Sequence, residues 1–270
     1  MRLGIFAKTF AGRDPMTVLG AAEAAGYRGV AYNMACSARE AMPATISDAE
    51  IAAVVAASAA TGQIIQSLSG TYNMIHPDPA VRSQGHARLA VLAAAARPMG
   101  TDLITLCTGT RDAADQWRHH GDNGSVAAWR DLIDSMTVAV KIAETHDIYL
   151  GVEPELGNVV NGALAARRLL DEMGTSRIRI VLDPANLFQI SDDPRGVIAE
   201  AVDLLGPSIA MAHAKDRDRN GGFAAAGTGV GDVGDFIGRL QQVGFDGPFV
   251  THGLAADEAP AVAEYLAGLL

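Results

Sequence analysis

The chain alternates short apolar runs with longer segments of helical spacing, and this alternation restricts its fold more than any other feature. Eight apolar runs, rich in β-branched residues or leucine, lie at residues 3–6, 29–32, 64–68, 103–107, 148–152, 178–182, 209–212 and 248–251. Ala-, Leu- and Glu-rich segments with helical spacing lie between them, for example at 15–25, 126–145, 161–173 and 257–269. The pattern predicts parallel strands joined by right-handed helical crossovers.

A closed eight-fold barrel fits this pattern best, because its strand–helix repeat takes roughly 30 residues. A doubly wound open sheet would place a Gly-rich turn after the first strand, but "IFAKTFAGRD" contains no GxGxxG motif. No linker or change of composition divides the chain. The sequence therefore predicts an α/β protein with one (β/α)8 TIM barrel domain over residues 1–270.

Local signals mark the expected helix ends. Asp48 and Ser125 are expected N-caps, and Pro15 and Pro79 stand where a first helical turn begins. Several helical segments end in Gly before a new apolar run, as in "AAGYRGV". Glycine is the usual residue at a left-handed helix cap.

Charge and cysteine content restrict the partners and the compartment. The chain carries 31 acidic and 21 basic residues, a net charge of -10, and no run of Lys or Arg, which disfavours nucleic acid as a partner. Cys36 and Cys107 lack the spacing of a disulfide or metal framework. No apolar stretch is long enough for a signal peptide or a membrane span. We therefore expect a cytoplasmic protein that does not bind membranes.

Polar residues gather after the predicted strands and are scarce before them. In a barrel of this kind the active site is built from the carboxyl ends of the strands and the loops that follow. Residues in these places are Asn73, His76, Arg111, Trp117, Glu153, Glu155, Asp183, Asn186, His213, Lys215, Asp216 and His252. The asymmetry predicts a site at this end. A site there also explains Asp183 in the apolar run "IVLDPANLF". A buried carboxylate without a partner is costly, so a role in a site gives a reason for its presence.

Four of these side chains stand one on each of four successive strands: Glu153, Asp183, His213 and His252. Two carboxylates and two imidazoles form a ligand set for a divalent metal such as Mn, Zn, Co, Fe or Mg. Each residue taken alone has another explanation, as a helix cap, a partner for Arg or a structural histidine. Together, at the same end of one barrel, they favour a metal site.

The motifs "LGVEPELGNVVN", "VLDPANL" and "AHAKD", in that order, resemble the sugar phosphate isomerase/epimerase superfamily, the xylose isomerase-like TIM barrels. The resemblance runs over most of the chain and includes "SGTYNMIHPD". It implies that Glu153, Asp183 and His213 fall at metal-binding positions. The strand-eight position of this superfamily usually holds a Glu that binds metal and moves a proton, but His252 stands there in this chain. A His often follows the strand-six Asp by three residues; here the residue is Asn186.

The resemblance implies an isomerase, epimerase or dehydratase that acts on a sugar, a sugar phosphate or a related polyol ketone. A base would remove the proton next to a carbonyl that the metal polarises, through a metal-stabilised enediolate. Glu153 or Glu155 is the expected base, with His252 second, and Lys215 would stabilise the developing oxyanion. The alternative for Lys215 is a salt bridge with Asp216 or Glu155. Because His252 replaces a Glu, epimerisation by two carboxylates is not favoured.

Further side chains are expected to contact the substrate. Asn73 and His76 would hydrogen-bond hydroxyl groups, Glu155 and Asn186 would line the same pocket, and Trp117 would stack on a sugar face. For Asn73 and His76 the alternative is loop architecture, and for Trp117 it is packing against its own loop. The stretch "GTGVGD" either approaches an anionic group through backbone N–H donors or forms a simple turn.

Two other functions stay open at this point. One is a barrel that binds a sugar or metabolite without turnover. The other is an enzyme like the apurinic-site endonucleases, which the acidic charge and the lack of a basic face disfavour. The expected partner is a small carbohydrate, and homo-oligomers are frequent in the superfamily.

Overall fold

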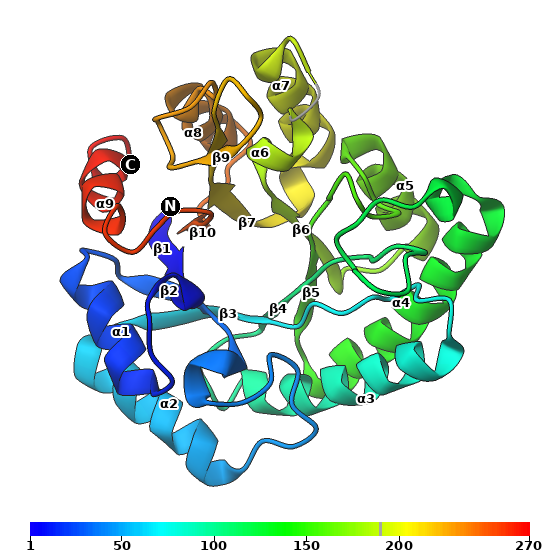
Figure 1. The fold of residues 1–270 in the computed structure, drawn as a ribbon, viewed down its shortest axis with the longest axis horizontal. Coiled ribbons are helices and arrows are strands. Elements are labelled where there is room, and N and C mark those ends of the chain that lie inside the picture. Colours follow the sequence, from blue (N-terminus) through cyan, green and yellow to red (C-terminus); the bar gives the residue numbers. More distant parts are fainter. Residues whose placement is uncertain (189–190) are drawn as a thin grey trace.

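The computed structural model describes residues 1–188 and 191–270, in which eight parallel strands close into a barrel surrounded by helices (Figure 1). Around the barrel the strands follow the order β1-β10-β7-β6-β5-β4-β3-β2. The barrel strands are β1 (Arg2–Phe6), β2 (Gly29–Tyr32), β3 (Ile64–Ser69), β4 (Leu103–Leu106), β5 (Tyr149–Val152), β6 (Ile178–Leu182), β7 (Ile209–Ala214) and β10 (Pro248–Thr251). The predicted α/β barrel is confirmed, and each strand overlaps its predicted apolar run.

A helix follows each barrel strand and covers the outside of the barrel. These helices are α1 (Pro15–Ala24), α2 (Asp48–Thr61), α3 (Pro79–Ala96), α4 (Val126–His146), α5 (Ala163–Met173), α7 (Pro194–Leu205), α8 (Val233–Gln242) and α9 (Ala259–Ala267). None of the helices in the described part of the chain is both long and apolar enough to cross a membrane.

Short elements add to this pattern, most of them at the carboxyl end of the barrel; the turn at Gly206–Ser208 precedes β7 and lies at the amino end. They are the short helix α6 (Pro184–Leu187), the 3-10 turns at Ala7–Thr9, Met34–Ser37, Gly121–Gly124 and Gly206–Ser208, and a hairpin of β8 (Asp216–Arg217) and β9 (Phe223–Ala224). The sequence did not predict these elements, because runs of two to four residues carry no periodicity.

Most of the expected helix starts are confirmed. Pro15 and Pro79 are the first residues of α1 and α3, and the Ser125 hydroxyl caps α4. The prediction that Asp48 caps α2 was wrong: Ser47 is the N-cap and Asp48 is the first helical residue. Ser47 forms a capping box with the third residue of the helix, which satisfies two backbone donors at once.

The barrel lumen is filled by apolar side chains from alternate positions of the strands. Its central layer consists of Ala31, Leu103, Val181, Met211 and Val250, all at most 5% exposed. Larger apolar residues on the opposite strand faces pack against the helices. The lumen is therefore a packed core, and the open space lies beyond its carboxyl end.

Gln66 packs against two glycines near the amino end of the barrel. Its amide nitrogen donates to the carbonyl oxygen of Arg2 at 3.1 Å. A Cβ added at Gly29 would lie 2.5 Å from the Gln66 side-chain carbon Cδ, and one at Gly4 would overlap the amide oxygen. Gly4 and Gly29 thus create the space that Gln66 occupies.

We predict that Gly29→Ala lowers the free energy of unfolding by about 2 kcal/mol, because overpacking typically costs 1–3 kcal/mol. In a Gln66→Ala background the same change should cost less than about 0.5 kcal/mol, since the colliding side chain is gone. Urea unfolding of the four proteins measures both values. Equal costs in the two backgrounds would show that Gln66 does not require these glycines.

Candidate active site

A cavity of about 500 Å³ lies at the carboxyl end of the barrel. Glu153, Glu155, His213, Lys215 and His252 all line it. The predicted catalytic residues therefore share one cavity at the end where strand polarity places active sites.

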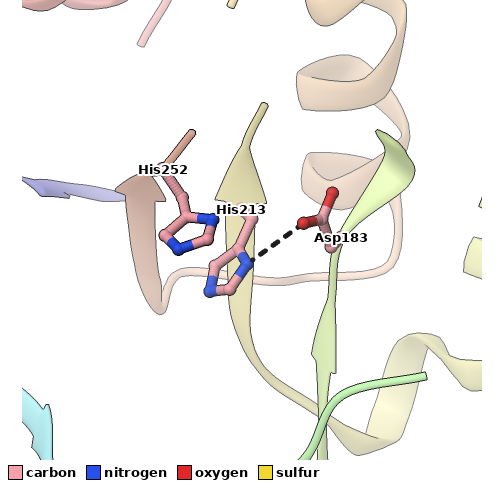
Figure 2. Close-up of side chains that lie close together, drawn as sticks. All are labelled: Asp183, His213 and His252. Carbon is pink, nitrogen blue, oxygen red and sulfur yellow. Dashed lines mark hydrogen bonds and ion pairs between the residues drawn. The ribbon is translucent and has the colours of Figure 1, made fainter. Parts of the chain in front are cut away.

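Asp183, His213 and His252 form the centre of this site (Figure 2). One ligand atom from each residue lies within 4.8 Å of the other two. They come from the ends of β6, β7 and β10, which are neighbours in the barrel. The two imidazole rings stack with their centroids 5.4 Å apart. Adjacent parallel strands thus bring together residues that are far apart in the sequence.

Asp183 serves both the fold and this cluster. Its Oδ1 atom accepts a hydrogen bond from the backbone N–H of Ala185 at 2.9 Å and caps α6. Its Oδ2 atom lies 3.4 Å from His213 Nδ1 and 3.1 Å from Lys215 Nζ. The buried carboxylate is therefore a helix cap and a member of the site at the same time.

Glu153 adjoins the cluster from β5. Its Oε1 atom lies 3.5 Å from His213 Nδ1 and accepts a hydrogen bond from Asn186 Nδ2 at 2.9 Å. Asn186 is buried and also donates to the carbonyl oxygen of Pro154 at 3.4 Å. Glu153 lies outside the group whose ligand atoms are mutually within 4.8 Å, so its contact with the cluster runs through His213.

The charges in the cluster stabilise one another. Burial opposes ionisation of Asp183 and Glu153, but Lys215 beside Asp183 and His213 beside Glu153 lower the pKa of these carboxyl groups. Burial likewise opposes a charge on His213, but the two carboxylates raise its pKa to about 9. For His252, burial and the nearby charges of His213 and Lys215 lower the pKa to about 4. His252 is therefore a neutral imidazole at pH 7.

The donor set fits a divalent metal ion. The contacts of His213 Nδ1 with Asp183 and Glu153, at 3.4 and 3.5 Å, exceed the ~2.9 Å of a good hydrogen bond. Two ligands that each lie ~2.1 Å from a tetrahedral ion are ~3.4 Å apart. Within the described residues, His252 Nδ1 is buried without a hydrogen-bond partner. Both observations match residues arranged to hold a common ion.

Lys215 is enclosed rather than free in the cavity. Only 5% exposed, it pairs with Asp183, donates to Asn186 Oδ1 at 3.4 Å, and lies 3.8 Å from the centre of the Phe223 ring. The expected alternative partners Asp216 and Glu155 are not its partners in the structure. Its ammonium group balances the charge of Asp183 and is held at the edge of the cluster.

Glu155 differs from Glu153 in having no fixed partner. Its carboxylate lines the cavity and forms no hydrogen bond or ion pair with any residue of 1–188 and 191–270. Burial and the neighbouring charge of Glu153 raise the pKa of Glu155 to about 7. A carboxyl group with this pKa is suited to both giving and taking a proton near neutral pH.

Asn73 and His76 lie outside this cavity. Asn73 donates to the carbonyl oxygen of Thr110 at 2.8 Å and accepts from its N–H at 3.0 Å. The His76 ring contacts the carbonyl oxygen of Ala113 at 3.1 Å and accepts from the N–H of Asp78 at 3.0 Å. These contacts match the loop architecture that was the alternative, and a substrate role for the two residues stays a prediction.

Two half-exposed aromatic side chains line the cavity. Trp117 is 50% exposed and Phe223, on the hairpin strand β9, is 54% exposed. The sequence singled out Trp117 but missed Phe223, because the hairpin itself was not predicted. Lys8, Asn33 and Ser69, which also line the cavity, were missed as well. They stand at the ends of the first three strands, where the rule used for the later strands would have found them.

The "GTGVGD" stretch is bound to a carboxylate of the chain itself. Asp216 is fully buried, and its Oδ1 atom accepts from the N–H groups of Arg217 and Gly231, both at 2.8 Å. Its Oδ2 atom accepts from the N–H of Gly229 at 3.0 Å. These donors are therefore engaged, which does not favour an external anion at this turn.

Comparison with protein families gives the class of the chain. Residues 19–269 match the family model described as xylose isomerase-like TIM barrel. The protein belongs to this family. Comparison of the sequence with curated proteins gives no match.

Solved structures share the fold at low sequence identity. A 3-keto-D-glucoside 4-epimerase from E. coli is 18% identical with a TM-score of 0.78, and the match covers 100% of this chain and 98% of that one. A D-allulose 3-epimerase from Methylomonas sp. is 16% identical with a TM-score of 0.77, covering 100% and 98%. A probable 3-DHS dehydratase from Bacillus anthracis is 14% identical with a TM-score of 0.75, covering 99% of each chain. These similarities establish the fold.

We predict that Asp216→Asn lowers the free energy of unfolding by about 2 kcal/mol, because an amide group would face donors that now bond to a charged oxygen. Backbone hydrogen exchange at Gly229 and Gly231 should become faster, as mass spectrometry of peptides over 227–232 can show. The matched control is Asp203→Asn, at an exposed position. Unchanged exchange in the Asp216 variant would contradict this role.

Proposed function

We propose that the protein is a metal-dependent isomerase or epimerase, or a dehydratase of the same proton-abstracting type, that acts on a small carbohydrate with a carbonyl group. The observation that carries the proposal is the cluster of Asp183, His213 and His252, whose two imidazoles line one cavity with the carboxylate of Glu155. The structural neighbours include two proteins named as sugar epimerases and one named as a probable dehydratase, which supports this class.

Asp183, His213 and His252 would hold the ion, with Glu153 as a fourth ligand. Two imidazoles with carboxylates suit Zn, Mn, Fe or Co better than Mg. An ion bound there would polarise the substrate carbonyl as a Lewis acid. Asn186 would fix the Glu153 carboxylate through its 2.9 Å hydrogen bond, in the manner of the outer partners that orient metal ligands.

Glu155 would carry the proton. In an isomerisation its carboxylate would remove a proton from the hydroxyl-bearing carbon next to the carbonyl and return it to the former carbonyl carbon, while the proton of that hydroxyl passes to the former carbonyl oxygen. Glu153 is less suited to this role because His213 and Asn186 hold its Oε1 atom. His252 is more suited to metal binding, because its neutral ring has a free Nδ1 atom within the described structure. A single carboxylate base favours proton transfer on one face of the substrate.

We predict that Asp183→Asn lowers the affinity for Mn²⁺ or Zn²⁺ by more than about 100-fold. Mutation of a residue that only hydrogen-bonds to a metal ligand typically lowers metal affinity 10–100-fold. Loss of a charged ligand itself should lower it further. Titration calorimetry and the metal content of the purified protein measure the effect. The matched control is Asp171→Asn, which removes an exposed carboxylate paired with Arg167. Equal affinity of the wild type and the Asp183 variant would contradict the metal site.

We predict that Glu155→Gln abolishes proton exchange while metal binding stays intact, because the amide cannot take up the proton. The assay follows deuterium incorporation from heavy water into a panel of ketoses by NMR, with Mn²⁺ present. Glu264→Gln, at an exposed position, is the control and should exchange like the wild type. Metal binding without exchange in the wild type would favour the sugar-binding barrel over the enzyme.

A further inference from the structure

The wall of the cavity opposite the cluster of Asp183, His213 and His252 carries polar side chains of a different kind. In the closed strand order, β1, β2 and β3 stand across the barrel from β5, β6 and β7 (Figure 1). Lys8 follows β1, Asn33 follows β2, and Ser69 ends β3. All three side chains line the cavity, and no part of the proposed reaction uses them.

Within the described part of the chain, these side chains present hydrogen-bond donors without a partner. Asn33 is only 4% exposed, and its Oδ1 atom accepts from the N–H of Ala35 at 3.0 Å, which assigns the opposite, NH₂ side of the amide as the free one. Ser69 is 7% exposed. Across residues 1–188 and 191–270, neither Asn33 Nδ2 nor the Ser69 hydroxyl has a hydrogen-bond partner. Both residues line the cavity, so these two groups are open to a ligand there.

Lys8 supplies a positive charge at the same wall. It forms no ion pair with any described carboxylate, unlike Lys215, which is paired with Asp183. The acidic residues that line the cavity, Glu153 and Glu155, both lie beyond β5 on the other side. The cavity therefore has carboxylates on one wall and donors with a cation on the opposite wall.

We propose that Lys8, Asn33 and Ser69 bind an anionic group of the substrate, a carboxylate or a phosphate, at the end opposite to its reacting carbonyl. The substrate class is thus an acidic carbohydrate. This inference rests on the proposed function in one respect: it assumes that the reacting carbonyl of the substrate lies at the cluster of Asp183, His213 and His252.

The donor pattern distinguishes an anion from a neutral sugar. A sugar hydroxyl both donates and accepts, so neutral sugars are bound by mixed donors and acceptors. The Asn33 amide oxygen is already used by the backbone, and Lys8 can only donate. Charge-assisted hydrogen bonds to an anionic oxygen are roughly twice as strong as neutral ones. Lys8 and the Asn33 NH₂ group therefore favour an accepting oxygen on the ligand, and the Ser69 hydroxyl can donate to the same group.

The test compares three hexoses that differ only at the sixth carbon: D-glucose, D-glucuronate and D-glucose 6-phosphate. Binding to the full chain, with Mn²⁺ present, is measured by titration calorimetry. At least one acidic compound should bind at least about tenfold more tightly than glucose, because one charge-assisted contact is worth that factor or more. Tighter binding of D-glucuronate would indicate a carboxylate site, and tighter binding of D-glucose 6-phosphate would indicate a phosphate site. Lys8→Met should reduce this preference about tenfold, whereas Lys141→Met, which removes an exposed lysine on α4, should leave it unchanged.

Equal affinity for the three compounds, no measurable binding of the acidic ones, or an unchanged preference in Lys8→Met would each overturn the inference. The measurement does not depend on turnover. An intact preference without proton exchange would therefore overturn the proposed function alone. Proton exchange without a preference would overturn the anion site alone.

Discussion

The carboxylate of Asp183 connects the fold to the site. One oxygen caps α6 and the other contacts His213 and Lys215, so neither is left without a partner in the interior. An uncompensated buried carboxylate would be expensive, and here a helix end, the Lys215 ammonium group and the His213 imidazole offset that cost. The position of α6, the orientation of His213 and the burial of Lys215 all depend on this side chain. The chemistry of the cavity is thus built on an interaction that the fold itself requires.

Much of the fold follows from the sequence because the barrel strands form short apolar runs and several helices, among them α4, α5, α7 and α8, have a regular apolar face. The exceptions are local. Ser47 outcompetes Asp48 as a cap because it can form a reciprocal bond with Glu50. The β8–β9 hairpin escapes prediction because its strands are two residues long and held by Asp216, a contact between a side chain and a distant turn. Such contacts leave no periodic signal.

For the site, the sequence indicated which end of the barrel to consider but not the partners of each side chain. The rule of strand ends grouped Asp183, His213 and His252 correctly in space. It could not separate Glu153, which is held by Asn186, from Glu155, whose carboxylate has no partner among the described residues, because the two stand two residues apart on one loop. It also assigned Asn73 and His76 a substrate role, which stays a prediction, and it did not show that backbone groups of the next loop engage both. Burial and hydrogen bonding at the level of single atoms decide these differences.

The packed lumen determines how small molecules enter and leave the cavity. Gln66, seated against Gly4 and Gly29, and the apolar layer that includes Met211 and Val181 leave no passage along the barrel axis. A compound that reaches the cluster must return by the way it came. If a reactant is converted there, the product has to depart before the next molecule can arrive. Accumulated product then competes directly with fresh reactant for entry.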